Sequence, residues 1–554
     1  MLFQTYQFLV LMLVVLAGIA LLRQPRSQHW LLLIASYVFY GWWDIRFLAL
    51  LLLTSMIDYS AALGMAGVKL PWSERLRLSA ILIVGTLLFL GPDWPAVQDG
   101  EGPVTTHSFL TEGYKVTKWG ILACSAFALV GPVIYGFYFR LAEDSRRRAF
   151  LITSVIGNLA VLGFFKYFNF FRENLVDLSC RLGHQWAIPE LSIALPVGIS
   201  FYTFVTMSYG IDAYRRQLVP ERSFVRMALF VAYFPHLVAG PIIRPEQLLP
   251  TLNTAWKLNA QRITSGFHLA LVGLVKKVLI ADSVQRMVVT LLDRPQGLPS
   301  LLIMLGAVLF AVQIYCDFSG YTDIARGVSR MLGVELPLNF NFPYFSTSII
   351  DFWRRWHISL SSWLRDYLYI PLGGGRVRPS RVYFNLLTTM VLGGLWHGAS
   401  WNFVIWGAYQ GALLCVNRLF GGLLLRSALL SRWFETRVAR VLCWAVTLYF
   451  VLLGWLIFYV KDLHQLLYAM KAYVFFDFRF DVAGPGLGGG SPAIALSALG
   501  IFVVLHAVSF FKLRWAEFLD RLPRPVLPVA YAFLGLVFFF AWPSEDAPFI
   551  YFQF

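Results

Sequence analysis

"VYFNLLTTMVLGGLWHGASWNFVIWGAYQGALLCVN", residues 382–417, contains no Asp, Glu, Lys or Arg and decides the fold class. A helix needs about 20 apolar residues to cross a hydrocarbon core about 30 Å thick. The stretch is therefore long enough for membrane helices near 383–396 and 398–416, with His397 between them. We expect this part of the chain to lie in a bilayer.

The composition of the whole chain agrees with this segment. Of its 554 residues, 58% are hydrophobic and only 14% are charged, whereas a soluble domain carries about 25% charged residues. The sequence predicts an all-α polytopic integral membrane protein, with about 11–14 membrane helices plus re-entrant and interfacial amphipathic helices. Further spans are predicted near 6–22, 30–42, 47–66, 78–91, 119–140, 149–170, 191–212, 264–281, 299–315, 438–459, 493–510 and 527–542.

Membrane topology explains the formal charge of +16. Short cytoplasmic loops of membrane proteins concentrate Lys and Arg, and a zigzag with the N-terminus outside places four basic loops in the cytoplasm. These loops contain Arg23 and Arg26; Lys69, Arg75 and Arg77; Arg146 to Arg148; and Arg215, Arg216, Arg222 and Arg226. The acidic loop 91–118 then lies outside. Proteins that bind single-stranded nucleic acid need a basic surface with aromatic side chains, and no such segment stands apart from the apolar spans. We therefore expect the lipid bilayer as a partner and no nucleic acid.

Two segments depart from the spanning pattern. Residues 227–245 are interrupted by Pro235, Gly240 and Pro241, and non-helical backbone at membrane depth must be packed in protein or line a wet cavity. The break indicates either a functional centre or a proline-kinked packing helix. Residues 344–381 mix aromatic and aliphatic residues with Arg and Asp, which is typical of amphipathic helices at the membrane interface.

Two histidines are the candidates for chemistry. His397 is an ionisable residue inside an uncharged run, which favours a functional role; a structural histidine bonded to a carbonyl is the alternative. His357, in "RRWHISLS" on the amphipathic segment, would by itself be structural. Brought to one polar channel, a neutral imidazole with a pKa near 6.5 could act as general base, taking a proton from a hydroxyl that attacks a thioester.

Other chemistries fit less well. The five cysteines lack metal-ligand spacing, no G-x-S-x-G elbow occurs in an α/β pattern, and "LGGGR" lacks the ending of a phosphate-binding loop. Asp317 and Asp323 could be paired acids of a membrane glycosyltransferase, but we expect them to pair with arginines or to cap helix ends. A transporter with His397 in a proton or solute pathway is the alternative from another class. It predicts broken helices in matching halves, and only one break is evident.

Five ordered motifs carry a resemblance to a known family. They are "LPVGISFYTF" (195–204), "FPHLVAGPIIRP" (234–245), "YCDFSGYTDIARG" (315–327), "FWRRWHISLSSWLRDYLYIPLGGGR" (352–376) and "GGLWHGASWNFVIWG" (393–407). In this order they resemble the membrane-bound O-acyltransferases (MBOAT). Within that family they are similar to the bacterial alginate O-acetylation (AlgI-like) branch, and more distantly to the D-alanyl transfer (DltB-like) branch.

The resemblance implies a helical ring with a thin centre and a division into three parts. These are N-terminal transmembrane helices (1–170), a catalytic core (171–460) and C-terminal transmembrane helices with a tail (461–554). His397 matches the family's nearly invariant histidine and His357 its second conserved position, so both are expected to be catalytic. No bound cofactor or metal is implied.

The resemblance also implies substrates and a location. The acyl donor is expected to be acetyl-CoA, and the acceptor an exopolysaccharide such as alginate, with cellulose or peptidoglycan as alternatives. Transfer to the polymer is expected to pass through a periplasmic or membrane-anchored SGNH-type acetyltransferase, at the bacterial inner membrane.

Substrate contacts are assigned to Arg354, Arg355, Trp396, Asp317 and Ser319. The arginines could bind the phosphates of the donor, although attraction to anionic lipid at the cytoplasmic surface is the simpler explanation. Three tryptophans are expected to fix the depth of the amphipathic segment in the interface; these are Trp353, Trp356 and Trp363.

Overall fold

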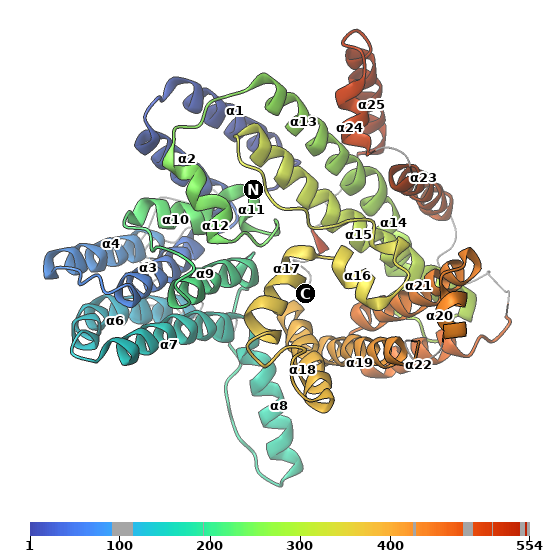
Figure 1. The fold of residues 1–554 in the computed structure, drawn as a ribbon, viewed down its shortest axis with the longest axis horizontal. Helices are drawn as coiled ribbons and strands as arrows, with labels where there is room; N and C mark the ends of the chain where they lie inside the picture. Colours follow the sequence, from blue (N-terminus) through green and yellow to red (C-terminus); the bar gives the residue numbers. More distant parts are fainter. Residues whose placement is uncertain are drawn as a thin grey trace. The chain divides into compact units, whose positions relative to one another are not determined.

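The computed structural model describes residues 1–90, 115–191, 193–424, 428–479, 491–511, 514–542 and 549–550, and these contain helices but no strand. The chain forms two compact units (Figure 1). The first comprises Met1–Leu258 with Leu332–Val334, and the second comprises Asn259–Met331 with Glu335–Phe554. The predicted external loop 91–118 lies outside the described residues, except where α6 begins. The predicted boundaries at 170 and 460 stay a prediction.

The first unit is built from helices that correspond to the predicted spans between residues 6 and 212. Its elements are α1 (Tyr6–Leu21), α2 (Pro25–Gly41), α3 (Leu48–Met65), α4 (Trp72–Leu90), α6 (Lys115–Tyr138), α7 (Glu143–Leu162), α8 (Phe168–Arg181), α9 (Ile199–Tyr214), α10 (Phe224–Ala232), α11 (Phe234–Leu237) and α12 (Pro245–Leu248). The helices α3, α4, α6 and α7 lie side by side (Figure 1). Almost every residue of α3 is buried, so this apolar helix forms the centre of the unit.

One carboxylate lies inside this apolar centre. Asp58 of α3 accepts hydrogen bonds from the Ser154 hydroxyl and from Asn158 Nδ2, the latter at 2.8 Å. Asn158 Oδ1 in turn accepts a hydrogen bond from Thr206 Oγ1 at 2.8 Å. A buried polar group is costly unless its hydrogen bonds are made, and this network meets that need while joining α3 to α7 and α9.

The break predicted within residues 227–245 is confirmed. The helix α10 ends at Ala232, the single turn α11 follows, and the chain then runs without helix to Arg244. Residues 227–243 are all buried, so protein surrounds this irregular backbone, as the bilayer requires. Gly240 is needed here, because a Cβ atom at this position would collide with the backbone of His236.

The second unit contains the other predicted spans and two short α-helices of the amphipathic segment, α16 and α17. Its elements are α13 (Ala260–Leu274), α14 (Asp282–Leu292), α15 (Ser300–Met331), α16 (Ile349–Arg355), α17 (Ile358–Leu364), α18 (Pro379–His397), α19 (Trp401–Leu424), α20 (Ala428–Phe434), α21 (Arg437–Tyr459), α22 (Leu463–Val474), α23 (Ser491–Phe511), α24 (Trp515–Arg521) and α25 (Leu527–Ala541). A π-helical segment, Arg365–Tyr369, continues α17.

The helices α13 and α15 pack closely along their length (Figure 1). A Cβ atom on Gly266 would lie 2.5 Å from the Gly327 carbonyl oxygen, and one on Gly273 would lie 2.5 Å from that of Gly320. Small residues let helix backbones approach in this way in membrane proteins. The same device joins α18 to α19, where Gly394 lies against the carbonyl of Phe403.

The helix α15 corrects the sequence prediction. Its span was expected to end near residue 315, but the helix continues to Met331. Asp317 and Asp323 lie in this extension, and their charges are compensated by Lys277 Nζ at 2.9 Å and Lys276 Nζ at 2.6 Å. Lysines therefore provide the main partners that were expected from arginines, with Arg326 adding a 3.4 Å contact to Asp323.

Seven helical segments of the described ranges are long and apolar enough to cross a membrane. They are Ile45–Met65, Gly120–Tyr138, Glu143–Arg181, Ala260–Leu292, Ser300–Met331, Arg437–Tyr459 and Pro492–Phe511. Two shorter apolar helices, Tyr6–Leu21 and Leu527–Ala541, accompany them. The all-α polytopic class is thus confirmed, while the larger number of membrane helices stays a prediction.

Candidate active site

His397 is the last residue of α18, and its ring lies in an aromatic enclosure. The helix ends here because Gly398 adopts an extended conformation before α19 begins at Trp401. The centre of the imidazole lies 5.0 Å from the ring of Trp396, 5.2 Å from that of Trp406 and 5.3 Å from that of Phe458. The residue is 5% exposed, so nearly all water is excluded from it.

His357 lies at the junction of α16 and α17 in an unusual backbone conformation. Its φ of 41° falls in the left-handed region, which non-glycine residues seldom adopt. The residue is 0% exposed. Its ring meets that of Phe318 edge to face at 4.7 Å. Burial lowers the pKa of His357 to about 3, so this imidazole is neutral at physiological pH.

Asn339 fixes the tautomer of His357. The Asn339 Oδ1 atom lies 3.2 Å from His357 Nδ1 and also accepts hydrogen bonds from the Ser359 amide at 3.2 Å and the Ser359 hydroxyl at 2.9 Å. Because the backbone amide can only donate, this Asn339 atom is the oxygen, and Nδ1 of the neutral imidazole must carry the proton. His357 Nε2 therefore carries the lone pair.

The indole of Trp396 connects the two histidines. Its ring lies 6.0 Å from the His357 ring and 5.0 Å from the His397 ring, and the residue is buried. From the sequence, the two histidines are expected to meet in a polar channel. The described residues instead place both imidazoles chiefly among aromatic rings, because α15 and α21 contribute Phe318 and Phe458 from distant parts of the sequence.

Comparison with known proteins identifies the family of the chain. Residues 157–460, which include both histidines, match the description "MBOAT, membrane-bound O-acyltransferase family". The chain belongs to the membrane-bound O-acyltransferase family. It is an acyltransferase and a multi-pass membrane protein, as the sequence motifs predicted.

Three relatives illustrate the range of the family. The acyltransferase is 36% identical to the probable alginate O-acetylase AlgI of Pseudomonas aeruginosa over 465 residues, which cover 84% of this chain and 73% of the relative. It is 35% identical to the peptidoglycan O-acetyltransferase of Helicobacter pylori, over 62% of this chain and 69% of the relative. It is 30% identical to the teichoic acid D-alanyltransferase of Bacillus subtilis, over 62% of this chain and 87% of the relative.

Asp317 and Ser319 of the acyltransferase flank Phe318 on α15 and are buried. The Asp317 carboxylate is held within the protein, since Oδ1 lies 2.9 Å from Lys277 Nζ and Oδ2 accepts a hydrogen bond from the Ile550 amide at 2.7 Å. These contacts position the turn that carries Phe318 against His357. A role of either residue in substrate binding stays a prediction.

The two arginines of the amphipathic segment differ in their surroundings. Arg354 is exposed at the end of α16. Arg355 Nε lies 2.9 Å from Asp351 Oδ1, one helical turn earlier, and Nη1 donates to the Asn341 carbonyl at 3.4 Å. Arg354 is therefore the better candidate for a contact with donor phosphates or with anionic lipid, and both assignments stay predictions.

The role expected for the tryptophans of this segment was wrong for two of them. Trp356 and Trp363 are only 2% and 5% exposed, so they pack inside the protein and do not lie in the membrane interface. Trp356 stacks on Phe352 at 5.7 Å and contacts Trp455 at 4.6 Å. Helix α16 thus packs its aromatic face on α21, and amphipathic patterning alone could not separate this case from interfacial anchoring.

Two further residues of the site, Asn339 and Trp406, were not predicted from the sequence. Asn339 gave a weak signal as an amide within "LPLNFNFP" (336–343). The only sequence signal for Trp406 was its position in the motif that contains His397. Its Nε1 atom is buried and has no hydrogen-bond partner in the described part of the chain, so this donor is available to a substrate atom. Within the same part, no cluster of three or more His, Cys, Asp or Glu residues could hold a metal ion.

Proposed function

We propose that this protein transfers acetyl groups from a cytosolic thioester, acetyl-CoA, across the inner membrane for O-acetylation of an exopolysaccharide such as alginate. The observation that carries the proposal is that His357 and His397 both contact the indole of Trp396 in a buried aromatic site. The Pseudomonas aeruginosa relative, whose match covers 84% of this chain, is named as a probable alginate O-acetylase.

His397 acts as general base in the proposed reaction. A hydroxyl oxygen attacks the thioester carbonyl while the imidazole takes its proton; the carbon–sulfur bond then breaks, and the thiolate leaves with that proton. The products are an acetyl ester and the free thiol. A water-poor site favours this outcome because water would otherwise hydrolyse the thioester.

His357 has a different part in the proposal. Since burial holds its pKa at about 3, it is too weak a base to retain a proton near neutral pH. Its oriented Nε2 lone pair instead accepts a hydrogen bond and positions the hydroxyl or its carrier. The final acceptor is reached through an SGNH-type acetyltransferase at the periplasmic face. Peptidoglycan is the second candidate acceptor, on the likeness to the Helicobacter pylori protein.

The decisive experiment measures polymer O-acetyl content in a deletion strain complemented with wild type, His357→Ala or His397→Ala at matched membrane levels. Loss of acetylation with His397→Ala, together with loss of acetyl-CoA cleavage by the purified protein in nanodiscs, supports the proposal. Full acetylation in both variants would contradict it. If His397→Ala abolishes acetylation but the purified wild-type protein never cleaves acetyl-CoA, a transporter with His397 in its pathway is favoured.

A further inference from the structure

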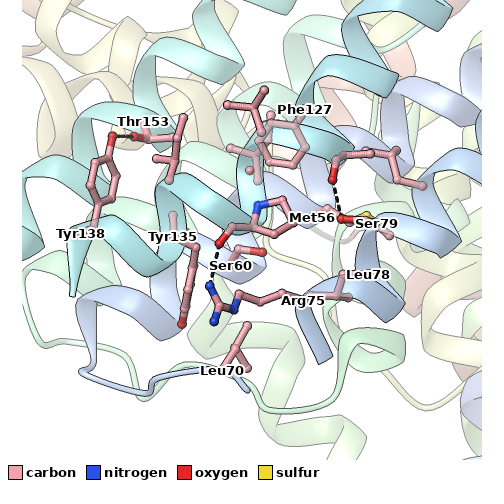
Figure 2. Close-up of a pocket in the computed structure, with 18 of the residues that line it drawn as sticks. Met56, Ser60, Leu70, Arg75, Leu78, Ser79, Phe127, Tyr135, Tyr138 and Thr153 are labelled. Carbon is pink, nitrogen blue, oxygen red and sulfur yellow. Dashed lines mark hydrogen bonds between the residues drawn. The ribbon is translucent and has the colours of Figure 1, made fainter. Parts of the chain in front are cut away.

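A cavity of about 430 Å³ lies in the first unit, between α3, α4, α6 and α7 (Figure 2). Sites for small molecules usually measure about 300–1,000 Å³, so the space is large enough for a ligand segment. Apolar side chains form most of its wall, among them Met56, Leu78 and Phe127. Val130 and Ile134 also line it and are 51% and 39% exposed, so the cavity opens on the outer face of α6.

A proline in α6 and two fixed contacts hold this cavity in shape. Pro132 has no N–H group, so the Ala128 carbonyl loses its helical partner. The Ser79 hydroxyl of α4 replaces it, donating to the Ala128 oxygen at 2.6 Å. One helical turn away, Arg75 Nη1 donates to the Pro132 carbonyl at 2.6 Å. These bonds link α4 to α6 on both sides of the open space.

Arg75 is a cation in the wall of this apolar cavity. Figure 2 shows its side chain running between Ser60 and Leu70, with the guanidinium beside Tyr135. The guanidinium carbon lies 4.6 Å from the centre of the Trp72 ring and 5.8 Å from that of Tyr135. Its Nε atom is buried without a hydrogen-bond partner, and no carboxylate of the described residues forms an ion pair with it. Arg75 therefore has a donor and a positive charge available.

More positive charge surrounds the same end of the cavity. Lys69 precedes the lining residue Leu70. The guanidinium of Arg146 lies 5.0 Å from the Phe139 ring, with its Nη2 atom beside Gly67. The Arg146 Nε atom is likewise buried without a partner in the described ranges. One end of the cavity therefore carries net positive charge, since three cations outnumber the neighbouring Glu74, and the remainder is apolar.

We propose that this cavity binds an anionic phospholipid, with one acyl chain between α4 and α6 and the phosphate on Arg75. An acyl chain matches the apolar walls and reaches them from the bilayer through the opening at Val130 and Ile134. A phosphate matches the guanidinium, which forms strong charge-assisted hydrogen bonds with phosphate oxygens. The basic loop places the headgroup in the leaflet predicted to be cytoplasmic, where anionic lipids attract Lys and Arg.

The test reconstitutes the full chain in nanodiscs that contain equal amounts of phosphatidylglycerol and phosphatidylcholine, and measures by native mass spectrometry which lipid stays bound. Wild type is expected to retain phosphatidylglycerol about tenfold over phosphatidylcholine, as one hydrogen-bonded charge contact would provide. Arg75→Gln should lose this preference. Arg77→Gln, an exposed position two residues along the same helix, should keep it.

Val130→Trp provides a second test, because it fills the opening from an exposed position without changing charge. This variant should retain neither lipid at the site. The proposal would be overturned if wild type retained both lipids equally or if Arg75→Gln kept the preference for phosphatidylglycerol. It would also be overturned if Val130→Trp still bound phosphatidylglycerol. Displacement of the lipid by inorganic phosphate alone would also overturn it, since the acyl chain would then contribute nothing.

Discussion

The imidazole of His357 and the indole of Trp396 lie 6.0 Å apart, ring centre to ring centre, with their planes inclined by 68°. Trp396 also contacts His397, which follows it in the chain. A single side chain therefore transmits the position of one histidine to the other. Small errors of placement matter in such a site, since a shift of 1 Å can cost about 100-fold in rate.

Replacing Trp396 by alanine should thus lower kcat for acetyl transfer by about 100-fold, because both imidazoles lose a packing partner. Trp396→Phe should retain much more activity, since it keeps a ring in place. Trp401→Ala is the matched control, as Trp401 belongs to the same pair of helices but is 56% exposed. Turnover of acetyl-CoA by purified variants in nanodiscs measures this. Equal activity of the Trp396→Ala variant and wild type would contradict the role of Trp396.

If the donor is the proposed thioester, the N–H group of Trp406 should stabilise the negative charge that develops on its carbonyl oxygen. Its ring lies 5.2 Å from His397, and its Nε1 atom is buried with no partner in the described residues. Loss of one such donor typically costs about 100-fold or more in kcat. Trp406→Phe is therefore expected to lower kcat with little change in the donor KM. Trp353→Phe is the control, because Trp353 Nε1 already donates to Gln410 at 3.3 Å. A changed KM with constant kcat would point to ground-state binding.

The pKa of His357 predicts a stability that depends on pH. The native pKa is about 3 and the ordinary value is about 6.5, so between these values the unfolded chain binds a proton that the native protein does not. This contribution to stability is complete above about pH 6.5 and is lost as the pH falls. From pH 6.5 to pH 5 the loss is at most about 2 kcal/mol, at about 1.4 kcal/mol per pH unit.

The variant His357→Asn isolates this effect. Asparagine tolerates the left-handed conformation of residue 357 and does not titrate. Its apparent Tm should fall less than that of wild type between pH 6.5 and pH 5, as measured by scanning fluorimetry in detergent. Parallel curves for the two proteins would show that His357 does not cause the change.

Hydropathy located the apolar helices well because each is encoded locally, although only seven of the described helical segments are long and apolar enough to cross a membrane. It missed the extension of α15 to Met331, because Asp317 and Asp323 are stabilised there by lysines from another segment. Likewise, the amphipathic pattern of residues 344–381 could not show whether Trp356 faces lipid or protein. Only packing against α21 decides that.

The candidate site shows the same limit. His357 and His397 could be selected from their positions in the motifs, because an ionisable residue in an apolar setting is informative by itself. The hydrogen bond from His357 to Asn339 and the contact with Phe318 could not be inferred, since both depend on how separate segments meet. No sequence motif indicated the proposed lipid cavity of the first unit. Its proline lies on α6 and its serine and arginine lie on α4, and only the fold brings these residues together.

The close approach of α18 and α19 should be intolerant of a single methyl group. A Cβ atom on Gly394 would collide with the carbonyl oxygen of Phe403 and lie 3.1 Å from Gly407 Cα. Gly394→Ala should therefore displace α18, and with it His397, and reduce both folded yield and activity. Gly421→Ala on α19 is the control, as nothing lies within 4 Å of a Cβ atom there. If Gly394→Ala and Gly421→Ala give equal folded yields in size-exclusion chromatography, α18 and α19 can move apart without loss of stability.

The buried lysine of the second unit should be essential for stability. Lys277 Nζ lies 2.8 Å from Asp282 and 2.9 Å from Asp317, and all three side chains are at most 7% exposed. Lys277→Met would remove the cation that lies between these two buried carboxylates, and breaking a buried pair in this way costs about 3–5 kcal/mol. A large fall in apparent Tm is therefore expected, which Asp317→Asn should partly restore in the double variant by removing one uncompensated charge.

Lys276→Met is the matched control for this prediction. Lys276 is the neighbouring residue, but its pair with Asp323 is more accessible, with side chains 24% and 14% exposed. Water can therefore compensate part of the lost interaction, and the fall in apparent Tm should be clearly smaller. If the two lysine variants lose equal stability, or if Asp317→Asn fails to restore any in the Lys277→Met background, the cost does not come from the buried charge of Asp317.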